Sequence, residues 1–318
     1  MSETPLVEVK NLIKTFQAKG KLLRAVNDIS LKIYPEETLG LVGESGCGKT
    51  AFARTLMRFY EATSGDIFFN GKSIVKYSAK QIRELRYHIQ YIFQDPYASL
   101  NPRMTAEEIV AEPLNIYRVL SPSDRKARVR ELLNLVGLRE ESLSRFPHEF
   151  SGGQRQRIGI ARALALNPRF IVCDEPIAAL DVSIQAQIIN LLKKLQEDMG
   201  LTYLFISHDL SMVKYLSSRV AVMYLGKLME LASSKDLYEN PLHPYTEALL
   251  SAIPIPDPVV ERKRTRIFLS GDVPSPIDPP KGCVFCTRCP KAMPICSQKP
   301  PKWKEVSPNH HVACHLFD

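Results

Sequence analysis

The sequence has no long apolar run. Its 318 residues contain no uninterrupted hydrophobic stretch near the roughly 18–20 residues that a membrane-spanning helix needs, so we expect the chain itself not to cross a membrane. Met1–Pro5 lack a basic segment followed by an apolar one, which disfavours secretion. Internal repeats and low-complexity tracts are also missing. These absences exclude a membrane channel, a disordered tail and a secreted disulfide scaffold.

The charge imbalance is small. Lys and Arg number 42 and Asp and Glu 34, so the net charge is +8. That excess permits an anionic partner, whether a nucleotide, a nucleic acid or an acidic membrane surface, without choosing among them. The hydrophobic share of 45% and the length predict an ordinary globular protein with one large or two ordinary domains.

Cysteine is scarce in the body of the chain and concentrated at its end. Only Cys47 and Cys173 precede residue 283, and the other five of the seven lie in the last 36 residues. Because thiols stay reduced in the cytosol, such clustering in a cytosolic protein favours a metal site over disulfides.

The N-terminal part predicts strands. Apolar and polar residues alternate over 6–10 and 26–33, as in a small antiparallel sheet. Residues 39–42 form a short apolar run that leads directly into glycines, which is typical of a buried strand feeding a loop. Residues 66–74 predict a hairpin, because Asn70-Gly71 favours the positive φ angles of a tight turn.

The rest of the chain alternates helices and strands. A helical pattern covers about 96–150, with a capping box at Thr105 and Glu108. Short apolar segments follow at 170–173, 201–207 and 219–224, and a helix at about 183–199 separates the first two. Such crossover connections predict an α/β protein with a mixed, largely parallel sheet. From about residue 240 frequent prolines indicate a surface linker.

The segment Gly43–Thr50 fits the pattern G-x-x-x-x-G-K-[ST] between a predicted strand and a predicted helix. Glycines let backbone amides surround phosphates, and the helix N-terminus adds positive potential. We expect Lys49 to reach the β- and γ-phosphates and Thr50 to ligate magnesium. A chance glycine turn is the alternative. The positions expected to bind ATP here are Gly43, Ser45, Gly46, Cys47, Gly48, Lys49, Thr50 and Ala51.

Two carboxylates end the apolar segment that starts at Phe170. We expect Asp174 to join the magnesium shell and Glu175 to polarise the water that attacks the γ-phosphate. By itself such a pair is more often a solvated loop, but the phosphate loop elsewhere in the chain favours the functional interpretation.

The segment Ser151–Arg157 supplies a second predicted anion site. Its serine and two glycines precede a helical stretch expected from Arg155 onward. With two such sites, the sequence resembles the ABC ATPases, the nucleotide-binding subunits of ATP-driven transporters, over roughly residues 5–255. The resemblance implies nucleotide clamped between two copies, with this second site formed by Ser151, Gly152, Gly153 and Gln154.

The resemblance also implies roles for four single residues. Phe16 corresponds to the aromatic that stacks on adenine, although a core aromatic on a strand is an equal alternative. Gln94 corresponds to the glutamine that contacts magnesium or the attacking water, Asp181 to a loop that contacts the dimer partner, and His208 to the histidine at the γ-phosphate.

Two positions depart from the family pattern. Phe150 replaces a leucine, apolar for apolar. Ala178 replaces a serine and so lacks a hydroxyl that could bond across the dimer, which puts the strength of one ATP site in doubt.

Two further segments, 93–103 and 243–250, narrow the resemblance to the ATPases of oligopeptide/dipeptide importers, with nickel importers as close relatives. This implies a second, often non-identical ATPase, two membrane permease subunits, an external binding protein, and a location on the cytoplasmic face of the cell membrane. A soluble ABC ATPase acting on nucleic acid or ribosomes is the alternative. The absence of a heptad insertion and of an aromatic-rich basic patch argues against it.

The resemblance suggests a division of the chain. We expect a P-loop ATPase core with an antiparallel β subdomain at 1–95 and 160–240, a helical signature subdomain at 96–159, and a Pro- and Cys-rich C-terminal extension at 241–318.

The C-terminal cysteines suit either a ferredoxin-like iron–sulfur cluster or structural zinc. The importer resemblance implies a structural 4Fe–4S cluster that leaves Cys286 out, although its x2 spacing could also make it a ligand. The expected ligands are Cys283, Cys289, Cys296 and Cys314. The basic run 262–266 favours a solvated linker over a contact with anionic lipid.

Overall fold

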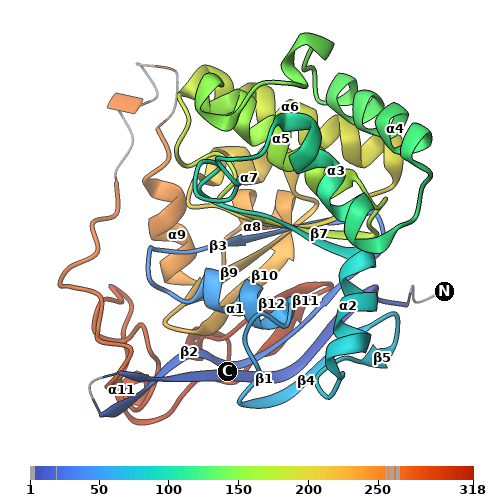
Figure 1. Cartoon of the computed structure of the whole chain (residues 1–318). Helices are drawn as coiled ribbons and strands as arrows, with labels where there is room; N and C mark the ends of the chain where they lie inside the picture. Colours follow the sequence, from blue (N-terminus) through green and yellow to red (C-terminus); the bar gives the residue numbers. More distant parts are fainter. Residues whose placement is uncertain (1–3, 19, 255–256, 258–260, 263–265) are drawn as a thin grey trace. The chain divides into compact units, whose positions relative to one another are not determined.

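The computed structural model describes residues 4–18, 20–254, 257, 261–262 and 266–318. The chain divides into two compact units, Met1–Lys76 with Ser207–Asp318, and Tyr77–Ile206. Figure 1 traces both along the sequence. Parts of the proline-rich stretch after residue 254 and of the basic run 262–266, for which a solvated linker was predicted, lie outside the described residues.

The first unit contains a four-stranded antiparallel sheet with the order β2-β1-β4-β5. Its strands are β1 (Val7–Ala18), β2 (Lys21–Ile33), β4 (Ser64–Phe69) and β5 (Lys72–Ser73). Asn70 and Gly71 connect β4 to β5 with φ angles of 50° and 73°. The predicted antiparallel strands and hairpin are confirmed.

The first unit also contains strands in the order β11-β12-β10-β9-β3, in which β3 and β9 are parallel. These are β3 (Thr38–Val42), β9 (Arg219–Tyr224), β10 (Lys227–Ser233), β11 (Lys304–Ser307) and β12 (His310–Val312). Its helices are α1 (Lys49–Leu56), α7 (Leu210–Leu216), α8 (Ser234–Glu239), α9 (Pro244–Ser251), α11 (Pro294–Gln298) and the 3-10 turn η3 (His315–Phe317). The C-terminal residues therefore extend the edge of a sheet, which the sequence did not indicate.

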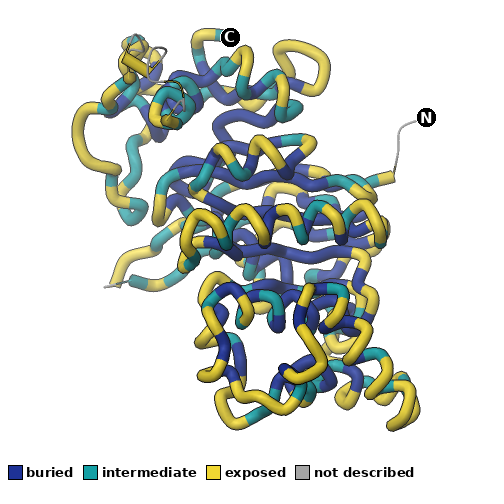
Figure 2. The backbone as a smooth tube through the Cα atoms, turned by 90° about the horizontal axis from the view of Figure 1, so that it is seen from above, coloured by how far each residue is buried: buried dark blue, intermediate teal, exposed yellow. Residues whose placement is uncertain are grey.

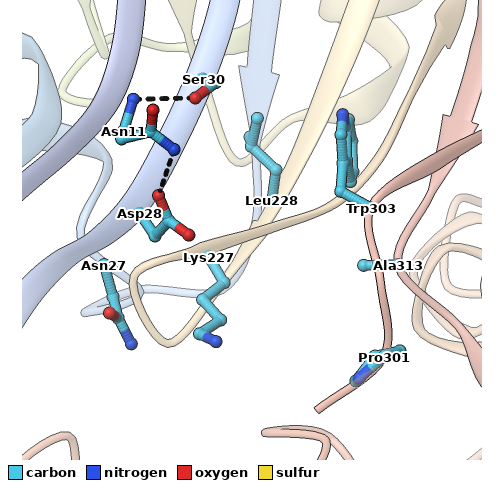
Figure 3. A pocket seen from close by; sticks show the side chains of 9 residues that line it. All are labelled: Asn11, Asn27, Asp28, Ser30, Lys227, Leu228, Pro301, Trp303 and Ala313. Carbon is cyan, nitrogen blue, oxygen red and sulfur yellow. Dashed lines mark hydrogen bonds between the residues drawn. The ribbon is translucent and has the colours of Figure 1, made fainter.

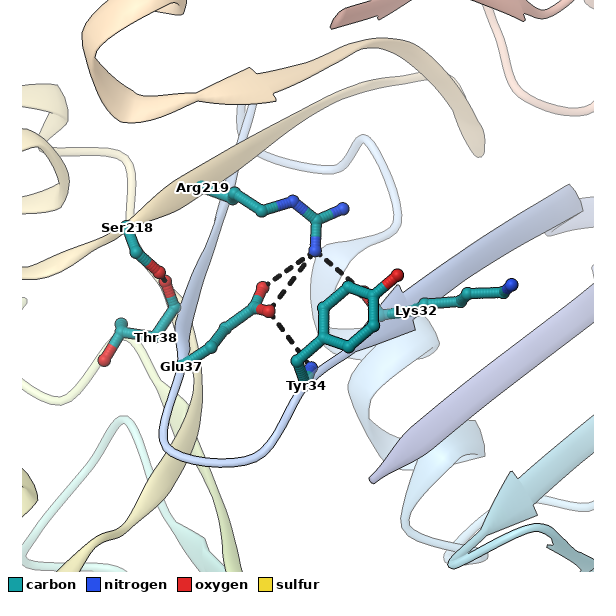
Figure 4. Close-up of polar contacts among 6 residues, drawn as sticks. All are labelled: Lys32, Tyr34, Glu37, Thr38, Ser218 and Arg219. Atoms are coloured by element: carbon teal, nitrogen blue, oxygen red, sulfur yellow. Dashed lines mark hydrogen bonds and ion pairs between the residues drawn. The ribbon is translucent and has the colours of Figure 1, made fainter. Parts of the chain in front are cut away.

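Polar contacts hold the start of β3 (Figure 4). Arg219 Nη1 donates to Glu37 Oε1 at 3.0 Å, and the other carboxylate oxygen accepts from Tyr34 N at 3.0 Å. Ser218 Oγ donates to the Thr38 carbonyl at 3.1 Å. Since all five residues of β3 are buried, the strand enters the core in a defined position.

A small pocket lies where the C-terminal segment approaches β1 and β2 (Figure 3). Pro301 and Trp303 line it together with the strand residues. Asn11 Nδ2 donates to Asp28 Oδ1 at 2.9 Å, and Asn11 N donates to Ser30 Oγ at 2.8 Å. These bonds satisfy polar groups at an irregular point of the β1–β2 pairing, so we assign them a structural role.

The second unit has three parallel strands in the order β8-β7-β6, with β6 at Ile89–Ile92, β7 at Phe170–Asp174 and β8 at Thr202–Ile206. Its helices are α2 (Ala79–His88), α3 (Ala106–Tyr117), α4 (Pro122–Leu135), α5 (Gly152–Leu164) and α6 (Val182–Met199), with 3-10 turns η1 (Glu140–Ser142) and η2 (Pro147–Glu149). All residues of β7 and β8 are buried, and Figure 2 shows buried backbone in dark blue. The expected parallel α/β arrangement is confirmed.

Side-chain caps determine where helices α3 and α5 begin. The capping box of Thr105 and Glu108 starts α3 as predicted. Helix α5, however, starts at Gly152 and not at Arg155, because Ser151 Oγ accepts from Gln154 N and the Gln154 amide oxygen accepts from Ser151 N. Among the described residues, no helix combines the length and the apolar character needed to span a membrane.

Candidate nucleotide-binding site

The loop after β3 is built around glycines that cannot be replaced without a clash. Gly43 has a φ of 151°, and a Cβ there would lie 2.1 Å from the Met223 carbonyl oxygen. Gly48, the N-cap of α1, has a φ of 107°, and its Cβ would lie 2.1 Å from the Ala25 carbonyl oxygen. The backbone therefore approaches its neighbours as closely as a glycine-rich phosphate loop requires.

Lys49 lies over this loop. Its side chain is buried, and Nζ donates to the carbonyl oxygens of Gly43 at 2.8 Å and Glu44 at 3.1 Å. Ser45 and Gly46, at the tip of the loop, are exposed. A lysine ammonium, the loop backbone and the N-terminus of α1 thus lie next to one another, which is the arrangement of a phosphate-binding loop.

Cys47 contacts its neighbours through both its backbone and its sulfur. Its carbonyl accepts from Gly226 N at 2.8 Å, and its Sγ accepts from Lys49 Nζ at 3.9 Å. Burial is the main cause of the raised pKa of its thiol, so the thiol is protonated.

The other expected residues of the first unit are Phe16 and His208. Phe16 lies half-buried on β1, edge-on to Tyr60 with ring centroids 5.3 Å apart. The exposed His208 precedes α7, whose N-cap is Asp209. The stacking of Phe16 on adenine and the contact of His208 with the γ-phosphate stay predictions.

In the second unit, the ends of β6 and β7 bring four polar side chains together. The buried Asp174 ends β7, and its Oδ2 accepts from the Tyr91 hydroxyl at 2.5 Å. Gln94 Nε2 donates to Glu175 Oε2 at 2.9 Å. Glu175 has a positive φ of 47°, and its N–H donates to the Ile206 carbonyl at 2.9 Å. These hydrogen bonds fix the orientation of the carboxylates of Asp174 and Glu175.

The signature segment forms the N-terminus of α5. Ser151 caps the helix and is exposed, while the buried Gly153 packs on α6, where an added Cβ would lie 2.4 Å from Ile184 Cγ2. Asp181 caps α6, and hydrogen bonds from Ile184 N and the Ser183 hydroxyl lower the pKa of its carboxyl. A side-chain cap therefore fixes the N-terminus of each of these two helices.

Three residues that contact the predicted site were not indicated by the sequence. No pattern singled out Tyr91, whose partner Asp174 is 83 positions away. Arg288 and Tyr245 contact the loop residue Glu44. An arginine among the clustered cysteines and a tyrosine after His243 were visible signals, but nothing local connects them to the phosphate loop.

Comparison with known proteins agrees with this geometry. Residues 26–178 match the ABC transporter family, and residues 229–296 match the oligopeptide/dipeptide transporter C-terminal region. The chain is 56% identical over its full length to the putative oligopeptide transport ATP-binding protein YkfD of Bacillus subtilis, covering 97% of that protein. It is 55% identical to the oligopeptide transport ATP-binding protein OppF of Haemophilus influenzae, over 96% of this chain and 93% of that protein.

The chain belongs to the oligopeptide transport ATP-binding proteins of the ABC transporter family. It is accordingly an ABC ATPase, which couples ATP hydrolysis to transport. The dimeric ATP-binding cassette MJ0796 bound to ADP and phosphate superposes with a TM-score of 0.66 at 30% identity, over 72% of this chain and 98% of that one. The expected ABC fold is confirmed.

The prediction of a C-terminal metal centre is wrong, both as a 4Fe–4S cluster and as zinc. Within the part of the chain that the structure describes, no three or more His, Cys, Asp or Glu side chains form a group able to hold a metal ion. The relatives of this ABC ATPase are named for oligopeptide transport and ATP binding, not for iron–sulfur chemistry.

The physical reason is the environment of the thiols. In the chain without a metal, burial raises the pKa of Cys283 to about 12 and also raises those of Cys289 and Cys314, so these thiols are protonated. Cys283, Cys296 and Cys314 are buried and act as small apolar residues that pack the C-terminal segment, whereas Cys289 is only partly buried. A cysteine spacing alone did not distinguish the two uses.

Proposed function

We propose that this chain hydrolyses ATP to power the import of oligopeptides or dipeptides, as one ATP-binding subunit of an ABC importer. The observation that carries the proposal is the loop between β3 and α1, where Gly43 and Gly48 have no room for a Cβ and Lys49 Nζ donates to the carbonyls of Gly43 and Glu44. The names of relatives at 55–56% identity supply the substrate class.

The expected site residues then have these roles. Lys49 and the loop amides bind phosphates, Phe16 stacks on adenine and His208 contacts the γ-phosphate. The oxygens of Thr50, Asp174 and Gln94 are hard ligands of the kind that magnesium prefers. Magnesium would neutralise charge on the phosphates, and Glu175 would polarise the attacking water.

The signature segment is proposed to serve the nucleotide of a second, homologous ATPase subunit. Ser151, Gly152, Gly153, Gln154 and Asp181 would face that partner, and Ala178 favours a heterodimer because one cross-dimer hydroxyl is missing. Two permease subunits and an external binding protein complete the proposed importer, which places this chain on the cytoplasmic face of the membrane. The division into core, helical subdomain (96–159) and C-terminal extension (241–318) stays a prediction.

The alternatives receive no support. A nickel importer ATPase or an ATPase acting on nucleic acid or ribosomes would share the same loop chemistry. However, the family match at residues 229–296 and the relatives' names point to oligopeptide and dipeptide transport.

Transport in proteoliposomes tests the proposal. The chain would be reconstituted with the permeases and the partner ATPase that are encoded beside it. Uptake of labelled oligopeptides would then be measured with and without ATP. We expect ATP-dependent uptake that Lys49→Ala abolishes. ATP hydrolysis that responds to RNA or ribosomes but not to permease and peptide would contradict it.

A further inference from the structure

We propose that Arg288 and Tyr245, both in the C-terminal part of the chain, are positioning residues for the phosphate-binding loop and act through Glu44. Arg288 also neutralises the Glu44 carboxylate next to the bound phosphates. This inference rests on the proposed function, since it assumes that the loop binds ATP.

Arg288 grips the side chain of Glu44 with both ends of its guanidinium. Nη1 donates to Oε2 at 2.7 Å, and Nη2 donates to Oε1 at 3.1 Å. The arginine side chain is only 9% exposed and that of Glu44 28% exposed. A bidentate, largely buried pair of this kind is among the strongest and most directional contacts between side chains.

Tyr245 holds the same residue by its backbone. Its hydroxyl accepts from Glu44 N at 2.9 Å. Glu44 follows Gly43 directly, and its carbonyl is one of the two that accept from Lys49 Nζ. The backbone amide, the side chain and the carbonyl of one loop residue are therefore all fixed, two of them by the C-terminal region.

A buried aromatic cluster makes this support rigid. Tyr224, Tyr245 and Phe285 are fully buried, with ring centroids 4.8–5.3 Å apart in each pair. Arg288 N donates to the Phe285 carbonyl at 3.0 Å, and its Nη1 lies 3.5 Å from the Tyr224 hydroxyl. The guanidinium thus projects from a packed turn and not from a loose tail.

Charge explains why the pair matters for a nucleotide. A carboxylate in a phosphate-binding loop repels a triphosphate, and repulsion is strong where water is partly excluded. The hydrogen bonds to Glu44 are the main reason that the pKa of Arg288 is raised, so the arginine stays charged. Removing the arginine leaves the negative charge of Glu44 uncompensated, whereas removing both charges does not.

The test measures the Kd of Mg-ATP for the full-length chain by isothermal calorimetry, with a thermal unfolding curve for each variant. We expect Arg288→Gln to weaken binding about tenfold, within the range of typical site-to-site couplings. Glu44→Gln weakens the contact with Arg288 but also removes a charge that repels the phosphates, so it should change the affinity by less than about threefold. Tyr245→Phe should weaken binding about threefold through the loss of one hydrogen bond. Adding Glu44→Gln to Arg288→Gln should recover most of the lost affinity.

Lys291→Gln is the matched control. Lys291 also connects the C-terminal segment to α9, through Glu247 at 2.7 Å, but it does not contact the loop. Its affinity for Mg-ATP should equal that of the wild type.

Three results would overturn the inference. Wild-type affinity in Arg288→Gln, or an affinity loss that Glu44→Gln fails to recover, contradicts it while the proposed function stands. A wild-type chain that does not bind Mg-ATP contradicts the proposed function, and this inference with it.

Discussion

Gln94 and Glu175 are 81 residues apart in the chain and joined by a 2.9 Å hydrogen bond from Nε2 to Oε2. The bond follows from parallel pairing, since Ile92 on β6 is opposite Cys173 on β7. The residues just after both strands therefore meet at the same edge. The amide of Gln94 therefore orients the carboxylate that we propose as the base.

Glu175→Gln should keep nucleotide binding and lose turnover. The substitution preserves shape but removes the charge that polarises water, so we expect ATPase activity in the assembled complex to fall on the order of 10²-fold or more. Glu141→Gln, an exposed carboxylate in η1, is the control. Near-normal turnover with Gln at position 175 would refute the assignment.

Gly153→Ala should destabilise the chain. The new Cβ would lie 2.4 Å from Ile184 Cγ2, a methyl group on a stiff β-branched side chain that cannot easily move away. We therefore expect the free energy of unfolding to fall by about 1–3 kcal/mol. Gly159→Ala in the same helix has open space around its Cβ and should stabilise by about 0.5–1 kcal/mol. Urea titrations give the free energy of unfolding of each variant. Equal effects of the two substitutions would show that close packing against Ile184 is not the reason that position 153 needs glycine.

His243 should make stability fall with acid. It is buried, its Nδ1 accepts from Tyr245 N at 3.0 Å, and burial lowers its pKa to about 4 from an ordinary 6.5. Because the unfolded chain takes up a proton first, the contribution is complete above pH 6.5 and is lost as pH falls toward 4.

His243→Asn tests this linkage. Asparagine can still cap α9 but does not titrate. By pH 5 the wild type should have lost about 2 kcal/mol that the variant retains. Unfolding midpoints at pH 7.5 and pH 5 give the comparison, and parallel losses in both proteins would exclude His243 as the cause.

The isolated chain should bind ATP but hydrolyse it slowly. The proposed heterodimer supplies signature residues in trans, so turnover should rise when the partner ATPase and permeases are added. Phosphate release assays with each component alone and combined measure the effect. Brisk, cooperative hydrolysis by the purified chain alone would argue for a homodimer.

Local sequence rules predicted much of the fold. Asn70-Gly71 specifies a turn by its backbone preferences, and Thr105 with Glu108 specifies a helix start by reciprocal hydrogen bonds. The glycine loop before Lys49 was recognisable because its steric and electrostatic requirements are met within eight consecutive residues. The predicted start of α5 was three residues too late. The glycines at 152 and 153 disfavour a helix, but the hydrogen bonds of the Ser151 cap outweigh that preference.

The sequence by itself determined the α/β class, the phosphate loop and the identity of most proposed site residues, since each depends on neighbours within a few positions. Only the tertiary structure decided what the C-terminal region does. Packing buries the thiols of Cys283, Cys296 and Cys314, and it brings Arg288 into contact with Glu44, 244 positions away in the sequence. The spacing of residues in a sequence does not reveal burial or long-range contacts. For that reason the sequence led to a wrong metal prediction and did not indicate that Arg288 supports the loop.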